Sequence, residues 1–208
     1  MFNESALSQS LAGLGIHNSR PLFTELQQAY GSSGRYYHDQ SHVAACLTQL
    51  SLVSHLADKP HEVAVALWFH DAVYDATKQD NEARSADWAS AYLSAEGVSE
   101  AVIKRIHNMI MATQTHQPKT DDEALLTDID LGVLGASESS FEAYEQGIRN
   151  EYHWAPIDAY VVGRVEVLQS FLACPRIYHT QHFYDLLEQT ARQNLMRKVD
   201  ELSQLTSL

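Results

Sequence analysis

Apolar residues recur at helical spacing along almost the whole chain. Val98, Val102, Ile106 and Ile110 form an i, i+4 row, and a longer row of the same kind runs through residues 183–199. This period places the apolar side chains on one face of an α-helix. The chain contains neither the alternation that marks a half-buried strand nor an Asn-Gly hairpin signal. We therefore expect an all-α protein, a helical bundle of about eight to ten helices.

The chain is long enough for one domain with a sizeable core. It has 208 residues, of which 45% are hydrophobic, and a domain of this size buries roughly 70% of the surface that its unfolded chain exposes. Residues 61–70, HEVAVALWFH, are apolar on nearly every side, which predicts a helix in the middle of that core. We expect a single domain over residues 1–208, with a functional core at about residues 35–130 and C-terminal helices at about residues 138–206.

The charge balance excludes some partners. The 14 Lys and Arg residues against 27 Asp and Glu residues give a formal net charge of −13, and an acidic surface repels nucleic acids and anionic membranes. No apolar run approaches the roughly 20 residues that span a bilayer, and the N-terminus lacks the features of a secretory signal. The two cysteines, Cys46 and Cys174, make no disulfide framework. We expect a cytoplasmic protein with no nucleic-acid surface and no membrane segment.

The first of three distinctive histidine and aspartate motifs follows a glycine-containing loop at residues 31–34. Its histidines, His38 and His42, are four residues apart. Asp39 or Ser41 is a candidate cap for the helix that follows. We therefore expect His38 just before the cap and His42 within the helix.

The other two motifs lie in or beside apolar helices. His70-Asp71 ends the apolar segment, where ionisable groups are costly to desolvate unless they are paired or bind a cation. Asp128 and Asp130 alternate with apolar residues in ALLTDIDLGVLG, so one carboxylate is expected to be buried and the other exposed. Taken alone, each motif also fits an ordinary helix end, with a hydrogen-bonded His–Asp pair in one case and a capping acid in the other.

Together the three motifs predict a metal site. Two histidines and two aspartates on separate core helices supply nitrogen and oxygen donors, which suit a six-coordinate divalent ion with vacant positions. Mn²⁺, Mg²⁺, Co²⁺, Ni²⁺ or Fe²⁺ fits such a set better than a closed structural zinc does. An ion with open positions polarises a phosphoryl oxygen and lowers the pKa of a water, and it also lets an acidic protein accept a phosphorylated substrate.

The order of these motifs resembles that of a known family. YHDQSHV, FHDAVYD, DNEARSA and TDIDLGVLG together are similar to the HD-domain superfamily of metal-dependent phosphohydrolases, and within it to a bacterial branch of predicted HD phosphohydrolases. The resemblance is most specific between residues 35 and 130. It implies an HD-type helical bundle with one divalent metal, held by His42, His70, Asp71 and Asp130, with Asp128 as the alternative to Asp130.

The resemblance also implies roles for residues outside the ligand set. Tyr37-His38-x-x-x-His42 is similar to a segment of cyclic-nucleotide phosphodiesterases, which makes His38 the general acid that protonates the leaving oxygen. The second-metal and base-recognition motifs of those enzymes are missing, so their specific activity is not implied. Glu82 would orient water or substrate, although Asp80-Asn81-Glu82 also fits a plain helix cap, and Asp128 is a second candidate for aligning the water.

The remaining candidates concern the substrate. His116 would contact phosphate, or else it is an exposed residue before Pro118. Arg35 and Arg149 are candidate phosphate clamps because guanidinium matches phosphate geometry, although a surface salt bridge is the ordinary role of either. Cys46 lies one helical turn after His42, and we interpret it as a small core residue rather than a ligand.

The sequence thus predicts a metal-dependent phosphohydrolase that cleaves a phosphate ester of a nucleotide or another small phosphorylated metabolite with metal-activated water. Whether the ester is a monoester or a diester is left open. The alternatives are a non-catalytic, metal-stabilised binding or regulatory module and a di-iron HD-type oxygenase, for which Glu82 and His116 are the only extra ligand candidates. The apolar row at residues 183–199 packs internally or against a second copy of the chain, which would form a homodimer.

Overall fold

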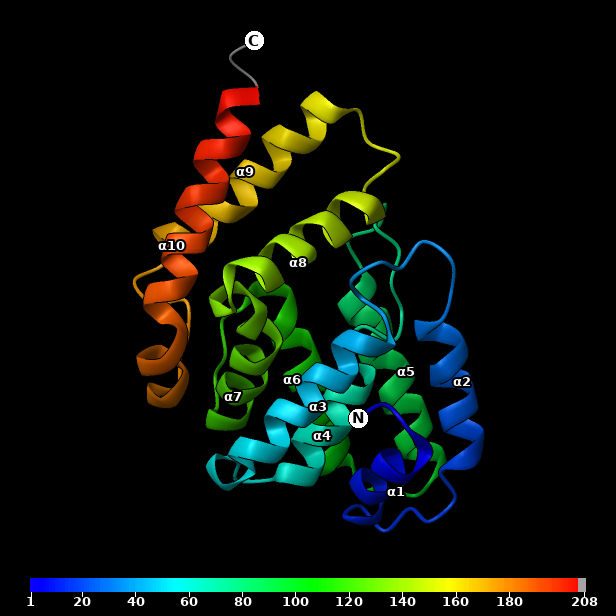
Figure 1. Ribbon diagram of the computed structural model, residues 1–208. Helices are drawn as coiled ribbons and strands as arrows, with labels where there is room; N and C mark the ends of the chain where they lie inside the picture. The colour runs from blue at the N-terminus through cyan, green and yellow to red at the C-terminus, as the bar shows by residue number, and fades with distance from the viewer. Residues whose placement is uncertain (206–208) are drawn as a thin grey trace. The chain divides into compact units, whose positions relative to one another are not determined.

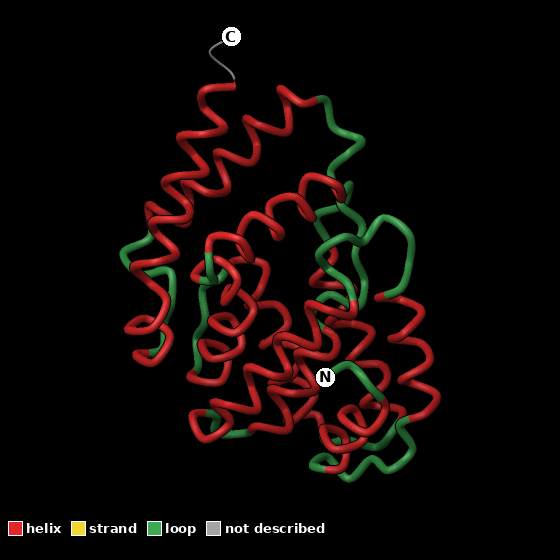
Figure 2. Tube along the Cα trace, in the orientation of Figure 1, coloured by secondary structure: helices red, strands yellow, loops and turns green. Residues whose placement is uncertain are grey.

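The structure is a computed structural model that describes residues 1–205. These residues form ten α-helices and two short 3₁₀ helices, which are joined by loops (Figures 1 and 2). No strand occurs in these residues. The expected all-α class and helix number are therefore confirmed. The ends of the expected domain and of its C-terminal helical segment, residues 208 and 206, lie outside the described residues.

The chain divides into two compact units of helices, the first covering residues 1–130 and the second beginning at Leu131. The first unit contains α1 (Glu4–Ala12), α2 (Arg20–Tyr30), α3 (Gln40–Val53), η1 (Ser54–Leu56), α4 (Pro60–Phe69), α5 (Asn81–Ala95), α6 (Glu100–Thr115) and α7 (Asp121–Asp130). The second contains η2 (Leu131–Gly135), α8 (Glu138–Glu151), α9 (Ile157–Ala173) and α10 (Gln181–Leu205). The boundary coincides with the end of the expected functional core, and the single domain over the whole chain stays a prediction.

Helix α4 is the centre of the first unit. It contacts α1, α3, α5, α6 and α7, and every residue from Glu62 to Phe69 is buried. The prediction of a core helix at residues 61–70 is confirmed, apart from the exposed His61 at its start. The buried carboxylate of Glu62 accepts two 2.7 Å hydrogen bonds from the Arg105 guanidinium of α6, which offset the cost of removing its charge from water.

Three helix ends of the first unit position the candidate site. Helix α3 begins after the loop at residues 31–39, α4 ends at Phe69, and α7 ends at Asp130. The three helices contact one another in every pairing. Residues at these ends are therefore close in space although they are far apart in the sequence.

The second unit is built on the antiparallel pair α9 and α10, which lie side by side (Figure 1). The Asn194 side chain of α10 donates hydrogen bonds to the carbonyl oxygens of Leu134 (2.9 Å) and Ala136 (3.0 Å), which joins η2 to α10. Arg164 of α9 forms a buried ion pair with Glu145 of α8. These contacts tie all four elements of the unit together.

Helix α10 carries the apolar row expected at residues 183–199. Phe183, Ala191 and Leu195 are buried, so part of the row packs within the chain, and a homodimer stays a prediction. None of the described helices, α10 included, is both long and apolar enough to cross a membrane.

Candidate metal centre

The first histidine of the site, His42, is oriented by the start of α3. Asp39 has an extended backbone, and its Oδ1 accepts hydrogen bonds from the main-chain nitrogens of Ser41 (2.7 Å) and His42 (3.3 Å). Such a side-chain acceptor is an N-cap, which fixes where the helix begins. Asp39 is thus the cap, and His38 precedes it as expected. His42 lies in the first turn of the helix and is buried.

The second histidine, His70, follows the last residue of α4 and is held in one orientation by that helix. Its Nδ1 lies 2.9 Å from the carbonyl oxygen of Leu67. Because a carbonyl only accepts hydrogen bonds, Nδ1 is the protonated nitrogen here. The Nε2 therefore faces the site and offers a lone pair there once it has lost its own proton, the orientation usual for a metal-ligating histidine.

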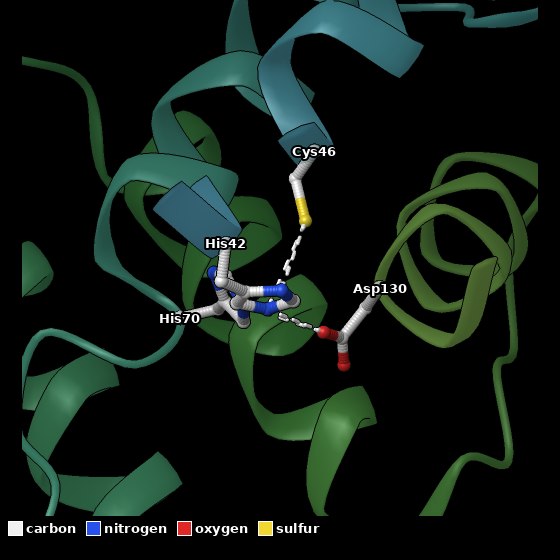
Figure 3. Close-up of side chains that lie close together, drawn as sticks. All are labelled: His42, Cys46, His70 and Asp130. Carbon is white, nitrogen blue, oxygen red and sulfur yellow. Dashed lines mark hydrogen bonds and ion pairs between the residues drawn. The ribbon is translucent and has the colours of Figure 1, made fainter. Parts of the chain in front are cut away.

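Two imidazole nitrogens and two carboxylate oxygens converge at this point, and Figure 3 shows three of the four residues, His42, His70 and Asp130. The Nε2 atoms of His42 and His70 are 3.0 Å apart, and Asp130 Oδ1 lies 3.0 Å from the first and 3.4 Å from the second. Asp71 Oδ2 lies 3.1 Å from His70 Nε2 and 3.5 Å from His42 Nε2. The four residues that the sequence predicts as ligands are therefore brought together.

The charges of this group favour a cation. Burial alone raises the pKa of the Asp130 carboxyl, but hydrogen bonds and the charges of His42 and His70 outweigh burial and hold that pKa well below its usual value. Burial is likewise outweighed at Asp71, whose pKa is lowered mainly by the charges of His70 and His38. The pKa of His70 is lowered by burial yet raised overall by Asp71 and Asp130. Both carboxylates are thus ionised and attract a positive charge.

The spacing of the donor atoms fits a single divalent ion. Two ligand atoms that each lie about 2.1 Å from an ion are separated by roughly 3.0 Å at a right angle and by roughly 3.4 Å in a tetrahedral arrangement. The two Nε2 atoms lie 3.0 Å apart, and each of them lies 3.0 to 3.5 Å from both carboxylate oxygens. The carboxylates of Asp71 and Asp130 keep 15% and 17% of their side-chain surface exposed, so a small molecule could approach from their side.

Arg35 joins the main chains on either side of the site. Its Nη1 donates hydrogen bonds to the carbonyl oxygens of His38 (2.8 Å) and Asp71 (2.7 Å), and its Nη2 donates to that of Ala72 (3.0 Å). The guanidinium also lies over the rings of Tyr30 and Tyr74. These bonds favour a positioning role over the expected phosphate clamp, because they direct the guanidinium towards protein oxygens.

Helix α5 holds the loop that follows Asp71. The buried Ser85 hydroxyl accepts a 3.0 Å hydrogen bond from the main-chain nitrogen of Val73 and donates to its carbonyl oxygen at 3.3 Å. The Asn81 amide makes a similar pair of bonds to the main chain of Asp75, each 3.0 Å long. The sequence analysis did not predict these hydrogen bonds. Their only signal in the sequence is the polar run DNEARSA, which follows a loop.

His38 lies beside the ligand group without joining it. Its half-buried ring stacks on Tyr74 with centroids 4.2 Å apart, and it lies 6.1 Å from the ring of His42. Its charge lowers the pKa of Asp71. This position, next to the ligands and half exposed, fits a proton donor better than a further ligand.

Glu82 is near the same group. It lies in the first turn of α5, where burial raises the pKa of its carboxyl and the negative charges of Asp71 and Asp130 raise it further, while the charge of His38 lowers it. These interactions put Glu82 within electrostatic reach of Asp71, Asp130 and His38.

Three other predicted residues have surroundings of their own. Asp128 is fully buried and precedes Asp130 by two residues on α7, so it points roughly 200° away around the helix axis. His116 ends α6 in the left-handed conformation, where its main-chain nitrogen donates to the Ala112 carbonyl oxygen. Arg149 belongs to the second unit, in which it donates to the carbonyl oxygens of Tyr152 and Ala155. Their roles in the reaction stay predictions.

One side chain that was interpreted as ordinary core lies at the centre. Cys46 is buried, and its Sγ lies 3.8 Å from Nε2 and 3.9 Å from Nδ1 of His42 (Figure 3). Its donor atom and those of His42, His70 and Asp130 all lie within 4.8 Å of one another. The i, i+4 spacing from His42 was the signal that could have found it.

Compared with protein-family models, with curated proteins and with solved structures, the chain has no match. The chemistry of this centre therefore has to be argued from its donor atoms, their geometry and the order of the motifs.

Proposed function

We propose that this protein is a metal-dependent phosphohydrolase of the HD type that acts on a small phosphorylated substrate, of which a nucleotide is the first candidate. One observation carries the proposal: at three helix ends, two imidazole nitrogens lie 3.0 Å apart, and two carboxylate oxygens each lie within 3.5 Å of both nitrogens. The resemblance in motif order to HD phosphohydrolases adds the reaction class, which geometry alone does not supply.

The ligands of the proposed ion are His42, His70, Asp71 and Asp130. A six-coordinate ion with four protein ligands would keep positions for water and substrate, as catalytic sites do. When bound, a divalent ion supplies Lewis acidity, which stabilises the negative charge on a phosphoryl group and makes a water easier to deprotonate. It also offsets the formal charge of −13, which otherwise repels an anionic substrate.

The neighbouring residues would handle the protons. His38 would protonate the leaving oxygen, and its stacking on Tyr74 would hold the ring in place while it does so. Glu82, whose pKa is raised by burial and by the nearby carboxylates, would accept a hydrogen bond from the attacking water and orient it. Arg35 would hold the main chains of His38 and Asp71 in fixed relative positions, because it donates hydrogen bonds to both of their carbonyl oxygens.

The test is phosphate release from a panel of nucleotides and sugar phosphates. Protein stripped with EDTA would be assayed alone and after addition of Mn²⁺, Mg²⁺, Co²⁺ or Ni²⁺, beside Asp130→Asn as a matched variant of nearly equal size. Metal-dependent release that Asp130→Asn lacks supports the proposal. Stoichiometric metal binding without release from any substrate contradicts it and favours a metal-stabilised binding module, whereas two tightly bound irons with a visible chromophore favour the oxygenase.

A further inference from the structure

We infer that Cys46 is a fifth ligand of the candidate centre, and that its thiolate makes the centre select a transition-metal ion such as Co²⁺, Ni²⁺ or Fe²⁺ over Mg²⁺. The inference rests on the metal centre of the proposed function but not on the reaction proposed there. It reverses the interpretation of Cys46 as a small core residue.

Cys46 and His42 share one face of α3. They are four residues apart, the spacing at which side chains of a helix are neighbours, and both are buried. Figure 3 shows the sulfur of Cys46 pointing toward the ring of His42, on the side from which Asp130 also approaches. The cysteine therefore faces the converging donor atoms and not the surrounding apolar core.

The distances fit coordination of the same ion. A sulfur about 2.3 Å and a nitrogen about 2.1 Å from one five-coordinate ion are separated by roughly 3.1 Å at a right angle and by roughly 3.8 Å at an angle of about 120°. Cys46 Sγ lies 3.8 Å from His42 Nε2, and no two donor atoms of the group with His70 and Asp130 are more than 4.8 Å apart. Small rotations of the side chains would bring all of them to bonding distance.

The sulfur would decide which metal binds. Thiolate is a soft ligand that transition-metal ions accept, whereas Mg²⁺ prefers carboxylate, carbonyl and water oxygens. On binding, the thiol loses its proton to solvent and a metal–sulfur bond forms, so the thiolate adds one negative charge to those of Asp71 and Asp130.

Cobalt reports on this bond directly. The metal-free wild-type chain would be titrated with Co²⁺, beside Cys46→Ala and the matched variant Cys174→Ala, which removes the exposed cysteine of the second unit. We expect a thiolate-to-cobalt charge-transfer band in the near ultraviolet for wild type and Cys174→Ala, and no such band for Cys46→Ala. We also expect Cys46→Ala to bind Co²⁺ at least about tenfold more weakly, with Mg²⁺ affinity changed by less than about twofold.

The possible outcomes separate the inference from the proposed function. Wild type that binds one Co²⁺ without the band, or Cys46→Ala that retains the band, overturns the ligand role of Cys46 and leaves the phosphohydrolase proposal standing. Wild type that binds no Co²⁺ but binds Mg²⁺ or Mn²⁺ overturns the inference alone, and wild type that binds no divalent ion overturns both. Should Cys46→Ala fail to fold, as judged by circular dichroism, Cys46→Ser supplies a hydroxyl of similar size, and the loss of the sulfur band is the same expected result.

Discussion

Arg35 donates a 2.7 Å hydrogen bond from its Nη1 to the main-chain carbonyl oxygen of Asp71, 36 residues further along the chain. The same nitrogen binds the carbonyl oxygen of His38. One guanidinium thus links the loop that carries the proposed proton donor to the loop that carries a proposed ligand. A guanidinium can do this because its donors form a rigid fork, which the single ammonium of lysine cannot replace.

Arg35→Lys should therefore lower kcat and leave KM nearly unchanged, because it disturbs the reacting groups without removing a substrate contact. We expect a fall in kcat of roughly tenfold and a loss of about 2 kcal/mol in the free energy of unfolding. Arg84→Lys, an exposed arginine of α5, is the control. Kinetics with the best substrate of the panel, together with urea denaturation, would measure both effects. A rise in KM with kcat unchanged would instead identify the expected phosphate clamp.

Loss of a ligand should remove the metal and, with it, part of the stability. His70→Ala and Asp130→Asn should each lower metal affinity by more than the roughly 10- to 100-fold typical of outer-shell changes. At a metal concentration of about 100 times Kd, the wild type gains about 2.7 kcal/mol of stability from binding, and these variants should gain almost none. Metal analysis after dialysis and thermal melts with and without EDTA would show both effects.

The variant Asp128→Asn tests which of the two aspartates of α7 is the metal ligand. Asp128 points away from Asp130 around the helix. This variant should therefore keep its metal, even if the change to the buried side chain lowers the free energy of unfolding. Full metal retention in Asp130→Asn together with loss in Asp128→Asn would show that the ligand had been assigned to the wrong carboxylate.

His38 should be needed for turnover but not for metal binding. Its ring stacks on Tyr74 and stands 6.1 Å from the ring of His42, outside the group of converging donor atoms. His38→Gln should therefore bind one metal with unchanged affinity and lose about 10²- to 10⁴-fold in kcat, the usual contribution of a general acid. A substrate with a good leaving group, such as a nitrophenyl ester, should recover much of the loss. Loss of metal from His38→Gln would make His38 a ligand.

The sequence was informative wherever local rules decide the structure. Helical periodicity predicted the all-α class, and the apolar run at residues 61–70 predicted the core helix α4, because burial on all sides leaves no polar face. At the start of the C-terminal helices, Ser137 caps α8 with its side chain and the helix starts at Glu138. A serine run fits a cap as well as a loop, and only the following helix distinguishes them.

Long-range contacts explain what the sequence left out. The three motifs together predicted a shared centre, the family resemblance implied His42, His70, Asp71 and Asp130 as its ligands, and these side chains do meet. The engagement of Arg35 with the carbonyl oxygens of Asp71 and Ala72 had no local signal, because those partners lie 36 and 37 residues away. The proximity of Cys46 to the donor atoms depends on where α4 and α7 end, which the pattern within α3 does not contain.

The buried ion pair of the second unit gives a test of stability that is independent of the metal. Arg164 and Glu145 are more than nine-tenths buried, and the Arg164 guanidinium also binds the Tyr144 hydroxyl at 2.8 Å. Glu145→Gln leaves the guanidinium without its counter-charge, so we expect a loss of about 3 kcal/mol in the free energy of unfolding. Glu138→Gln, which breaks a more exposed pair with Arg197, should cost less than about 0.5 kcal/mol.

Both variants should keep one metal per folded molecule, because all proposed ligands belong to the first unit. Denaturant titration gives the stabilities, and metal analysis of the folded fraction gives the stoichiometry. Equal stability of the two variants would mean that the Arg164–Glu145 pair contributes no more than an exposed pair does. Loss of metal from folded Glu145→Gln would show instead that the metal centre depends on the second unit.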